Sequence, residues 1–117
     1  MGIIGIAGGV QAFSAANGGK IHAFNNLSTT PQVVLPANPS RVSVTFHNPH
    51  ASIDMYVAPS TDYAGATLTP TTSALGGCFK IFASNTLTLV GEVQVAWQAF
   101  SASSSGLPFT AMETNFA

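Results

Sequence analysis

Charge is what this 117-residue chain has least of. Lysine, arginine, aspartate and glutamate make up 6% of its residues, whereas a free-standing soluble domain carries about 25%. Twelve serines and twelve threonines must therefore keep the surface hydrated, and little charge is left to keep copies of the protein apart. The composition predicts a subunit of a larger assembly rather than a solitary domain.

Basic residues are too few to hold a polyanion. The chain has three lysine and arginine residues against four acidic ones, for a formal net charge of −1. Lys20, Lys80 and Arg41 cannot form the basic stripe that neutralises phosphates, so nucleic acid is excluded as an expected partner.

Cys78 is the only cysteine, which excludes an intrachain disulfide and with it the class of small disulfide-stapled secreted domains. We expect its thiol to be buried and structural, because no nucleophile motif surrounds it. The first residues lack the basic segment of a signal peptide, so no export is expected.

Residues 1–30 are predicted to form an N-terminal arm and lead-in, separate from a domain at 31–117. The apolar start is too short and too rich in glycine to span a membrane, although a membrane-active arm is an alternative. Docking the arm on its own domain would gain on the order of 10 kcal/mol from burial but cost on the order of 20 to 30 kcal/mol of backbone entropy. We therefore expect a neighbouring subunit to order it, through these side chains: Ile3, Ile4, Ile6, Val10 and Phe13.

From residue 31 onward, turn residues separate stretches in which apolar and polar residues alternate, and no stretch keeps a helical period. The pattern predicts an all-β, antiparallel β-sandwich. The long connection at 58–77 favours a jelly roll. Strands are expected at 32–35, 41–48, 53–57, 78–82, 86–90, 93–100 and 107–112, with a further short one near 66–69.

The strands at 41–48 and 53–57 are predicted to pair as a hairpin across the turn residues 48–51. Alternation in the first strand puts Val42, Val44 and Phe46 on the core face, with Arg41 on the opposite, polar face. The predicted core contains Val42, Val44, Phe46, Ile53, Met55, Val57, Leu87, Leu89, Val95 and Trp97.

The residues that could form a catalytic or metal-binding site give only weak evidence for one. His47 and His50 have a spacing that two zinc ligands can share, with His22 or Cys78 to complete a set, but a strand end and a turn need not converge. Acidic residues are expected to be surface groups rather than a glycosidase pair. No catalytic residue, cofactor or metal is predicted, and the protein is not expected to be an enzyme.

The segment at 38–49, Asn-Pro-Ser-Arg-Val-Ser-Val-Thr-Phe-His-Asn-Pro, runs into Ile-Asp-Met-Tyr-Val at 53–57. It resembles small virion proteins of tailed bacteriophages, in which an arginine-led strand ends at Asn and turns into a strand ending in a Tyr-Val-like pair. The length, low charge, single cysteine and the strand Gly-Glu-Val-Gln-Val-Ala-Trp-Gln-Ala-Phe at 91–100 are similar to capsid decoration proteins, also called cement proteins.

The resemblance implies a non-enzymatic virion protein, made in the host cytoplasm, that binds the outer capsid surface and cements neighbouring major capsid subunits against the pressure of packaged DNA. Its expected partners are the major capsid protein and copies of itself, as a homodimer or homotrimer. Arg41, the only arginine, and Phe100, on the second face of its strand, join the expected interface residues. For Arg41 the alternative is a solvated strand end.

A second interpretation is a receptor- or carbohydrate-binding module of the phage head or tail. In that case Trp97, Tyr56 and Tyr63 would be the stacking residues. A lone tryptophan in an alternating strand is more often part of a core or a subunit interface.

Overall fold

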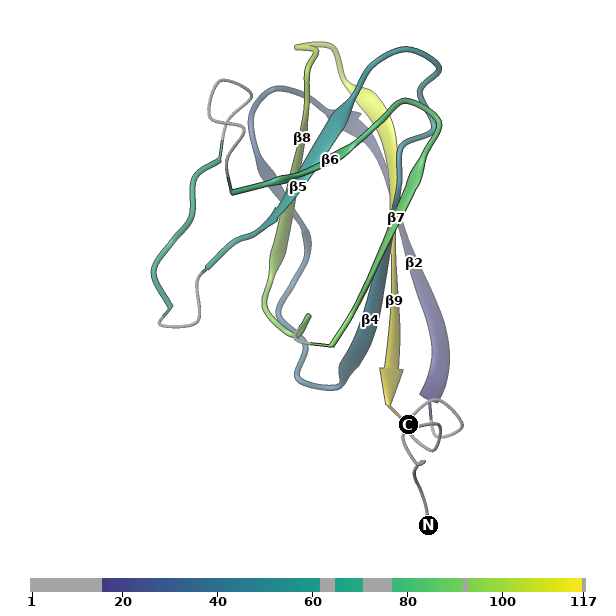
Figure 1. Cartoon of the computed structure of the whole chain (residues 1–117), viewed down its shortest axis with the longest axis vertical. Helices are drawn as coiled ribbons and strands as arrows, with labels where there is room; N and C mark the ends of the chain where they lie inside the picture. Colours follow the sequence, from purple (N-terminus) through teal and green to yellow (C-terminus); the bar gives the residue numbers. More distant parts are fainter. Residues whose placement is uncertain (1–15, 62–64, 71–76, 92, 117) are drawn as a thin grey trace.

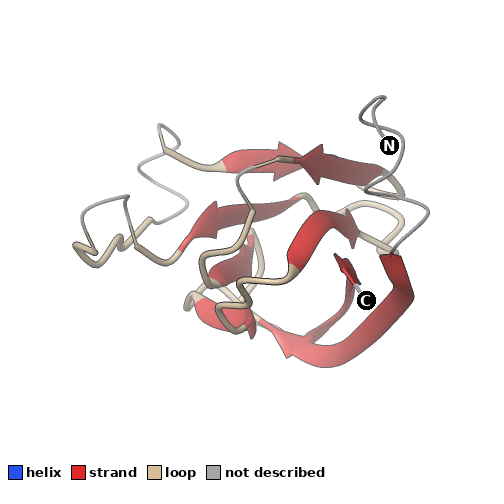
Figure 2. Cartoon of the chain, turned by 90° about the horizontal axis from the view of Figure 1, so that it is seen from below, coloured by secondary structure: helices blue, strands red, loops and turns tan. Residues whose placement is uncertain are grey.

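The computed structural model describes residues 16–61, 65–70, 77–91 and 93–116. In Figure 2 the regular elements of that part of the chain are all β-strands, joined by loops. The strands are β2 (Ala16–Leu27), β3 (Gln32–Leu35), β4 (Arg41–His47), β5 (Met55–Pro59), β6 (Phe79–Ile81), β7 (Thr86–Val90), β8 (Trp97–Ser101) and β9 (Leu107–Phe116).

Two antiparallel sheets of four strands make up the molecule. The β2 sheet has the order β2-β9-β4-β7, and the β3 sheet has the order β3-β8-β5-β6. Figure 1 shows β5, β6 and β8 on one side and β2, β4, β7 and β9 on the other. The first half of the chain pairs with the second half in reverse order: β2 with β9, β3 with β8, β4 with β7 and β5 with β6. The chain therefore folds back on itself once, like a single long hairpin whose strands are divided between the two sheets. This is the strand order of a jelly roll, so the predicted fold class is confirmed.

The core lies between the two sheets and is built from the apolar side chains that alternate along each strand. The Phe46 ring lies 5.6 Å from that of Trp97 and 6.1 Å from that of Phe109, centroid to centroid, so rings from both sheets interlock. Of the predicted core residues, these are buried: Val42, Val44, Phe46, Met55, Val57 and Trp97. These are half-buried: Ile53, Leu87, Leu89 and Val95.

The predicted hairpin between residues 41–48 and 53–57 is wrong, because β4 and β5 lie in different sheets. Asn48, which is fully buried, shows why. Its side-chain amide donates to the Ile53 carbonyl at 2.7 Å and to the Ile81 carbonyl at 3.1 Å, and its backbone amide donates to the Asn85 carbonyl at 3.0 Å. The segment after β4 is therefore a crossover between sheets rather than a tight turn.

The strand β2 belongs to the sandwich although the sequence places it in the arm. It pairs with β9 from Ala16, opposite Phe116, to Leu27, opposite Leu107. The sandwich therefore begins well before the predicted boundary at residue 31.

Near 66–69 the structure has an isolated bridge between Thr61 and Thr67 in place of the expected strand. Within the described ranges, no helix has the length and apolar character needed to cross a membrane.

Candidate functional site: a buried charge network

Arg41 is fully buried even though it opens β4. Simple alternation would place it with Ser43 on the outward face, but the register between β4 and β9 shifts between these two residues. A bulge of this kind inserts one residue and re-aims the side chain before it. Arg41 and Val42 consequently both point inward, as their burial shows.

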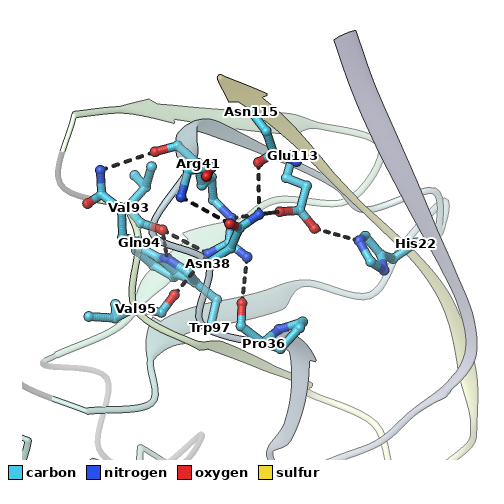
Figure 3. Close-up of polar contacts among 11 residues, drawn as sticks. His22, Pro36, Asn38, Arg41, Val93, Gln94, Val95, Trp97, Glu113 and Asn115 are labelled. Atoms are coloured by element: carbon cyan, nitrogen blue, oxygen red, sulfur yellow. Dashed lines mark hydrogen bonds and ion pairs between the residues drawn. The ribbon is translucent and has the colours of Figure 1, made fainter. Parts of the chain in front are cut away.

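The Arg41 guanidinium donates hydrogen bonds to acceptors within the same chain (Figure 3). Its Nη2 donates to the Pro36 carbonyl at 2.6 Å, and its Nη1 donates to the carbonyls of Val93 at 2.8 Å and Val95 at 2.9 Å. Its Nε donates to Glu113 Oε1 at 3.2 Å. The planar fork of an arginine suits such a set of fixed acceptors, and it ties the start of β4 to β9 and to the segment before β8.

Glu113, 4% exposed, is the second centre of the network. Its Oε1 accepts a hydrogen bond from Asn38 Nδ2 at 2.8 Å, and its Oε2 lies 2.8 Å from His22 Nε2. Burial acts to raise the pKa of Glu113, but the bonds from Asn38 and His22 and the charge of Arg41 outweigh burial and hold the pKa below its ordinary value. The ionised carboxylate therefore joins β2, β9 and the lead-in to β4.

Arg41 and Phe100, two of the expected interface residues, are buried within the chain. Both side chains are 0% exposed. The Arg41 guanidinium is hydrogen-bonded within the network described above. The Phe100 ring stacks on the Tyr56 ring with 5.1 Å between centroids. Every residue of β8, which lies between β3 and β5, is buried. The remaining predicted interface residues lie outside the described residues: Ile3, Ile4, Ile6, Val10 and Phe13.

The aromatic platform of the carbohydrate-binding interpretation is also not formed by the described rings. Trp97 is 4% exposed and Tyr56 is 7% exposed. The indole of Trp97 donates to the Val93 carbonyl at 3.3 Å, beneath the Arg41 network. Tyr63 lies outside the described residues. Trp97 and Tyr56 serve packing, and neither presents a face to a ligand.

The histidines near the crossover have separate partners. His47 Nδ1 lies 2.9 Å from Thr86 Oγ1, and His50 Nδ1 accepts two backbone amides of its own turn, at 3.0 and 3.1 Å. Where the structure describes the chain, it brings together no group of three His, Cys, Asp or Glu side chains that could hold a metal ion. Cys78 is half-buried, and this burial raises the pKa of its thiol.

A pocket that the sequence did not indicate lies on the β3 sheet, beside the loop at 65–70. It has a volume of about 320 Å³, apolar walls that include Val33 and Leu68, and a rim of hydroxyls. The Ser60 Oγ on its wall is buried and has no hydrogen-bond partner. The Gln98 amide donates to the Leu68 carbonyl at 2.8 Å and holds the loop to the sheet. The described lining carries no charge, so the pocket suits an uncharged group.

Comparison with protein-family models and with curated proteins finds no match for this sequence. Among solved structures, the chain is similar to part of the IMPa metallopeptidase in complex with T-antigen, with a TM-score of 0.53 and 10% sequence identity. The similarity covers 86% of this chain and 13% of that chain. At this identity the likeness shows the fold alone, because one fold carries many functions.

Proposed function

We propose that this protein is a non-enzymatic virion structural protein that binds the outer surface of a phage capsid. It cements neighbouring major capsid subunits there, and its partners are the major capsid protein and further copies of itself. The observation that carries the proposal is the near absence of charge from the surface of the folded chain.

Folding removes charge from a surface that has little to begin with. Two of the seven charged residues, Arg41 and Glu113, neutralise each other inside the molecule. At most five are left for an accessible surface of 5974 Å², where a typical chain of this length has about 29 in total. Lys80 pairs with Asp54 at 3.3 Å, and Lys20 is the charged residue of the described ranges that has no salt bridge.

Such a surface fits a protein that is covered by neighbours in its working state. Copies with little net charge do not repel one another and associate readily, and in an assembly this association takes place through specific contacts. A protein that clamps capsid subunits holds them through the total area of its contacts: an ordinary interface buries about 800 Å² per partner, and the contact is repeated over the shell. The Arg41 network stiffens the clamp by fixing β2, β4 and β9 to one another.

Electron cryomicroscopy of intact particles from the source phage tests this proposal. We expect density for the sandwich at repeated positions on the outside of the shell. Particles assembled without the protein should release DNA at a lower temperature, and adding the purified protein should restore the original temperature. Absence of the protein from the shell, or a shell whose stability does not change, would rule the proposal out.

The pocket at Ser60 favours a second candidate, the receptor- or carbohydrate-binding module of a head or tail. A buried hydroxyl without a partner is costly unless a ligand satisfies it, and the uncharged lining fits a neutral hydroxylated ligand. A glycan array compares the wild type with Ser60→Val. Binding that the variant loses would support this candidate, and no binding by the wild type would exclude glycans.

A further inference from the structure

The outer face of the β2 sheet is the set of side chains on β2, β9, β4 and β7 that point away from the core. Strand register places Ile21, Met112, Thr45 and Thr88 in one row across all four strands. The adjacent row carries Thr114 on β9 and Val90 on β7. We refer to this surface as the outer sheet face.

The outer sheet face combines exposed apolar groups with hydroxyls and holds no lysine, arginine, aspartate or glutamate among its described residues; His47 is its titratable side chain. Ile21, 67% exposed, and Val90, 63% exposed, are the two most exposed large apolar residues of the described chain. They lie on its opposite edge strands. Exposed apolar groups that share one face mark a contact surface more than scattered ones do.

Most side chains on this face are short and stiff. Threonine and isoleucine are branched at Cβ and keep few rotamers, and two of the threonines hold each other, with 3.0 Å between Thr45 Oγ1 and Thr88 Oγ1. Burying such groups costs less side-chain entropy than burying lysine or glutamate. The face is therefore organised for contact before a partner arrives.

Its area reaches the lower limit of a stable interface. Four strands spaced about 4.8 Å apart, with a mean length of about 28 Å, present about 500 Å². Two copies pressed together would bury about 1,000 Å², which is the smallest area expected of a specific interface. The contact would hold on its own at moderate concentration and would be reinforced where many copies sit on one particle.

We infer that two copies of this protein associate through their outer sheet faces. A face without fixed charge offers nothing by which a charged partner could be selected, whereas a second copy presents the same hydroxyl and apolar rows and puts no like charges opposite one another. The inference adds to the proposed function the surface through which copies contact one another. It rests on the proposed function only in placing that contact on a virus particle.

Sedimentation of the full chain, between about 1 µM and 1 mM, tests the inference. Ile21→Lys and Thr88→Glu each place a charge on the outer sheet face, and each should weaken dimerisation at least tenfold. Phe82→Lys, at an apolar position 56% exposed directly after β6, and Thr30→Glu, at an exposed loop position, are the matched controls and should dimerise like the wild type. Hydroxyl-radical oxidation of Met112 in the wild type should fall as the dimer forms, a readout that needs no variant.

A monomeric wild type, or controls that weaken the dimer as much as the face variants do, would overturn the inference. So would Met112 oxidation that is independent of concentration, even if both face variants failed to fold. Capsid binding is measured separately. A dimer of the expected kind that ignores capsids would defeat the proposed function alone, and a monomer that decorates capsids would defeat this inference alone.

Discussion

Arg41 binds four acceptors that belong to three different stretches of the chain, among them the carbonyls of Pro36 and Val93. A methionine there would fill similar space but would leave Glu113 buried without its cation. We predict that Arg41→Met lowers the free energy of unfolding by about 3 to 5 kcal/mol, the range for breaking one side of a buried ion pair. Urea denaturation measures it.

Lys80→Met is the matched control, because Lys80 and Asp54 form an ion pair whose side chains are 40% and 31% exposed. Exposed pairs contribute about 0 to 1 kcal/mol. Equal losses in Arg41→Met and Lys80→Met would show that the buried network has no special weight in the stability of the fold.

The lowered pKa of Glu113 makes stability depend on pH in one direction. The folded pKa is below the unfolded value, for which 4.5 is the reference. The contribution of the carboxylate is therefore fully present above the unfolded pKa and is lost as pH falls through the folded pKa. We predict that Glu113→Gln is less stable than the wild type at pH 7 and that the difference shrinks in acid. Urea midpoints measured from pH 7 to pH 2 would refute this if the two curves stayed parallel.

Phe46 contacts rings of both sheets and is 0% exposed. We predict that Phe46→Ala costs about 3 to 5 kcal/mol of unfolding free energy, because a large cavity would open between the sheets. Phe82, 56% exposed, is the control. Thermal denaturation should show Phe82→Ala close to the wild type. A Phe46→Ala protein of unchanged stability would mean that the core refills the space.

At the scale of elements, alternation located the strands but not their partners. The predicted strands at 32–35 and 86–90 agree with β3 and β7, because turn residues and β-branched residues mark them locally. The hairpin failed because the same polar residues that build a tight turn also build a crossover. What distinguishes the two is the bond from Asn48 to Ile81, 33 positions away, which no local pattern contains.

The candidate site escaped sequence analysis for a related reason. A bulge at the start of β4 reverses the direction of Arg41, and its cause lies in the pairing with β9 rather than in the residues around it. Glu113 and His22, which complete the network, are 91 positions apart in the chain. One signal was present in the sequence: Arg41 opens a strand that contains no other lysine, arginine, aspartate or glutamate, in a chain with very few charges.

The start of β2 sets where the chain can be shortened. Because pairing with β9 begins at Ala16, we predict that deleting residues 2–14 leaves the sandwich folded, with unchanged far-UV circular dichroism, and weakens its retention on capsids. Deleting residues 2–27 removes β2 and the His22 contact to Glu113, and this protein should not fold. A shorter deletion that unfolds the protein, or that decorates capsids as tightly as the full chain, would disprove the role of the arm.

For the whole molecule, the small number of surface charges predicts association near the isoelectric point. The sequence pI is about 6.2, where the remaining repulsion between copies vanishes. We predict that light scattering at fixed concentration rises to a maximum near that pH and falls on either side. Particles of monomer size throughout the pH range, at high concentration, would contradict this and would also weaken the case for an assembly subunit.

The pairing of β2 with β9 also bears on how the protein is made. Residues such as His22 and Glu113 meet across 91 positions of chain, and a ribosome needs about 5 to 20 s to add that many residues. During that interval β2 has no β9 to pair with, and folds dominated by such distant contacts are slow to form in any case. The nascent chain therefore carries β2 without its partner strand while the residues between β2 and β9 are added, and the long edge of β2 is open to other chains during that time.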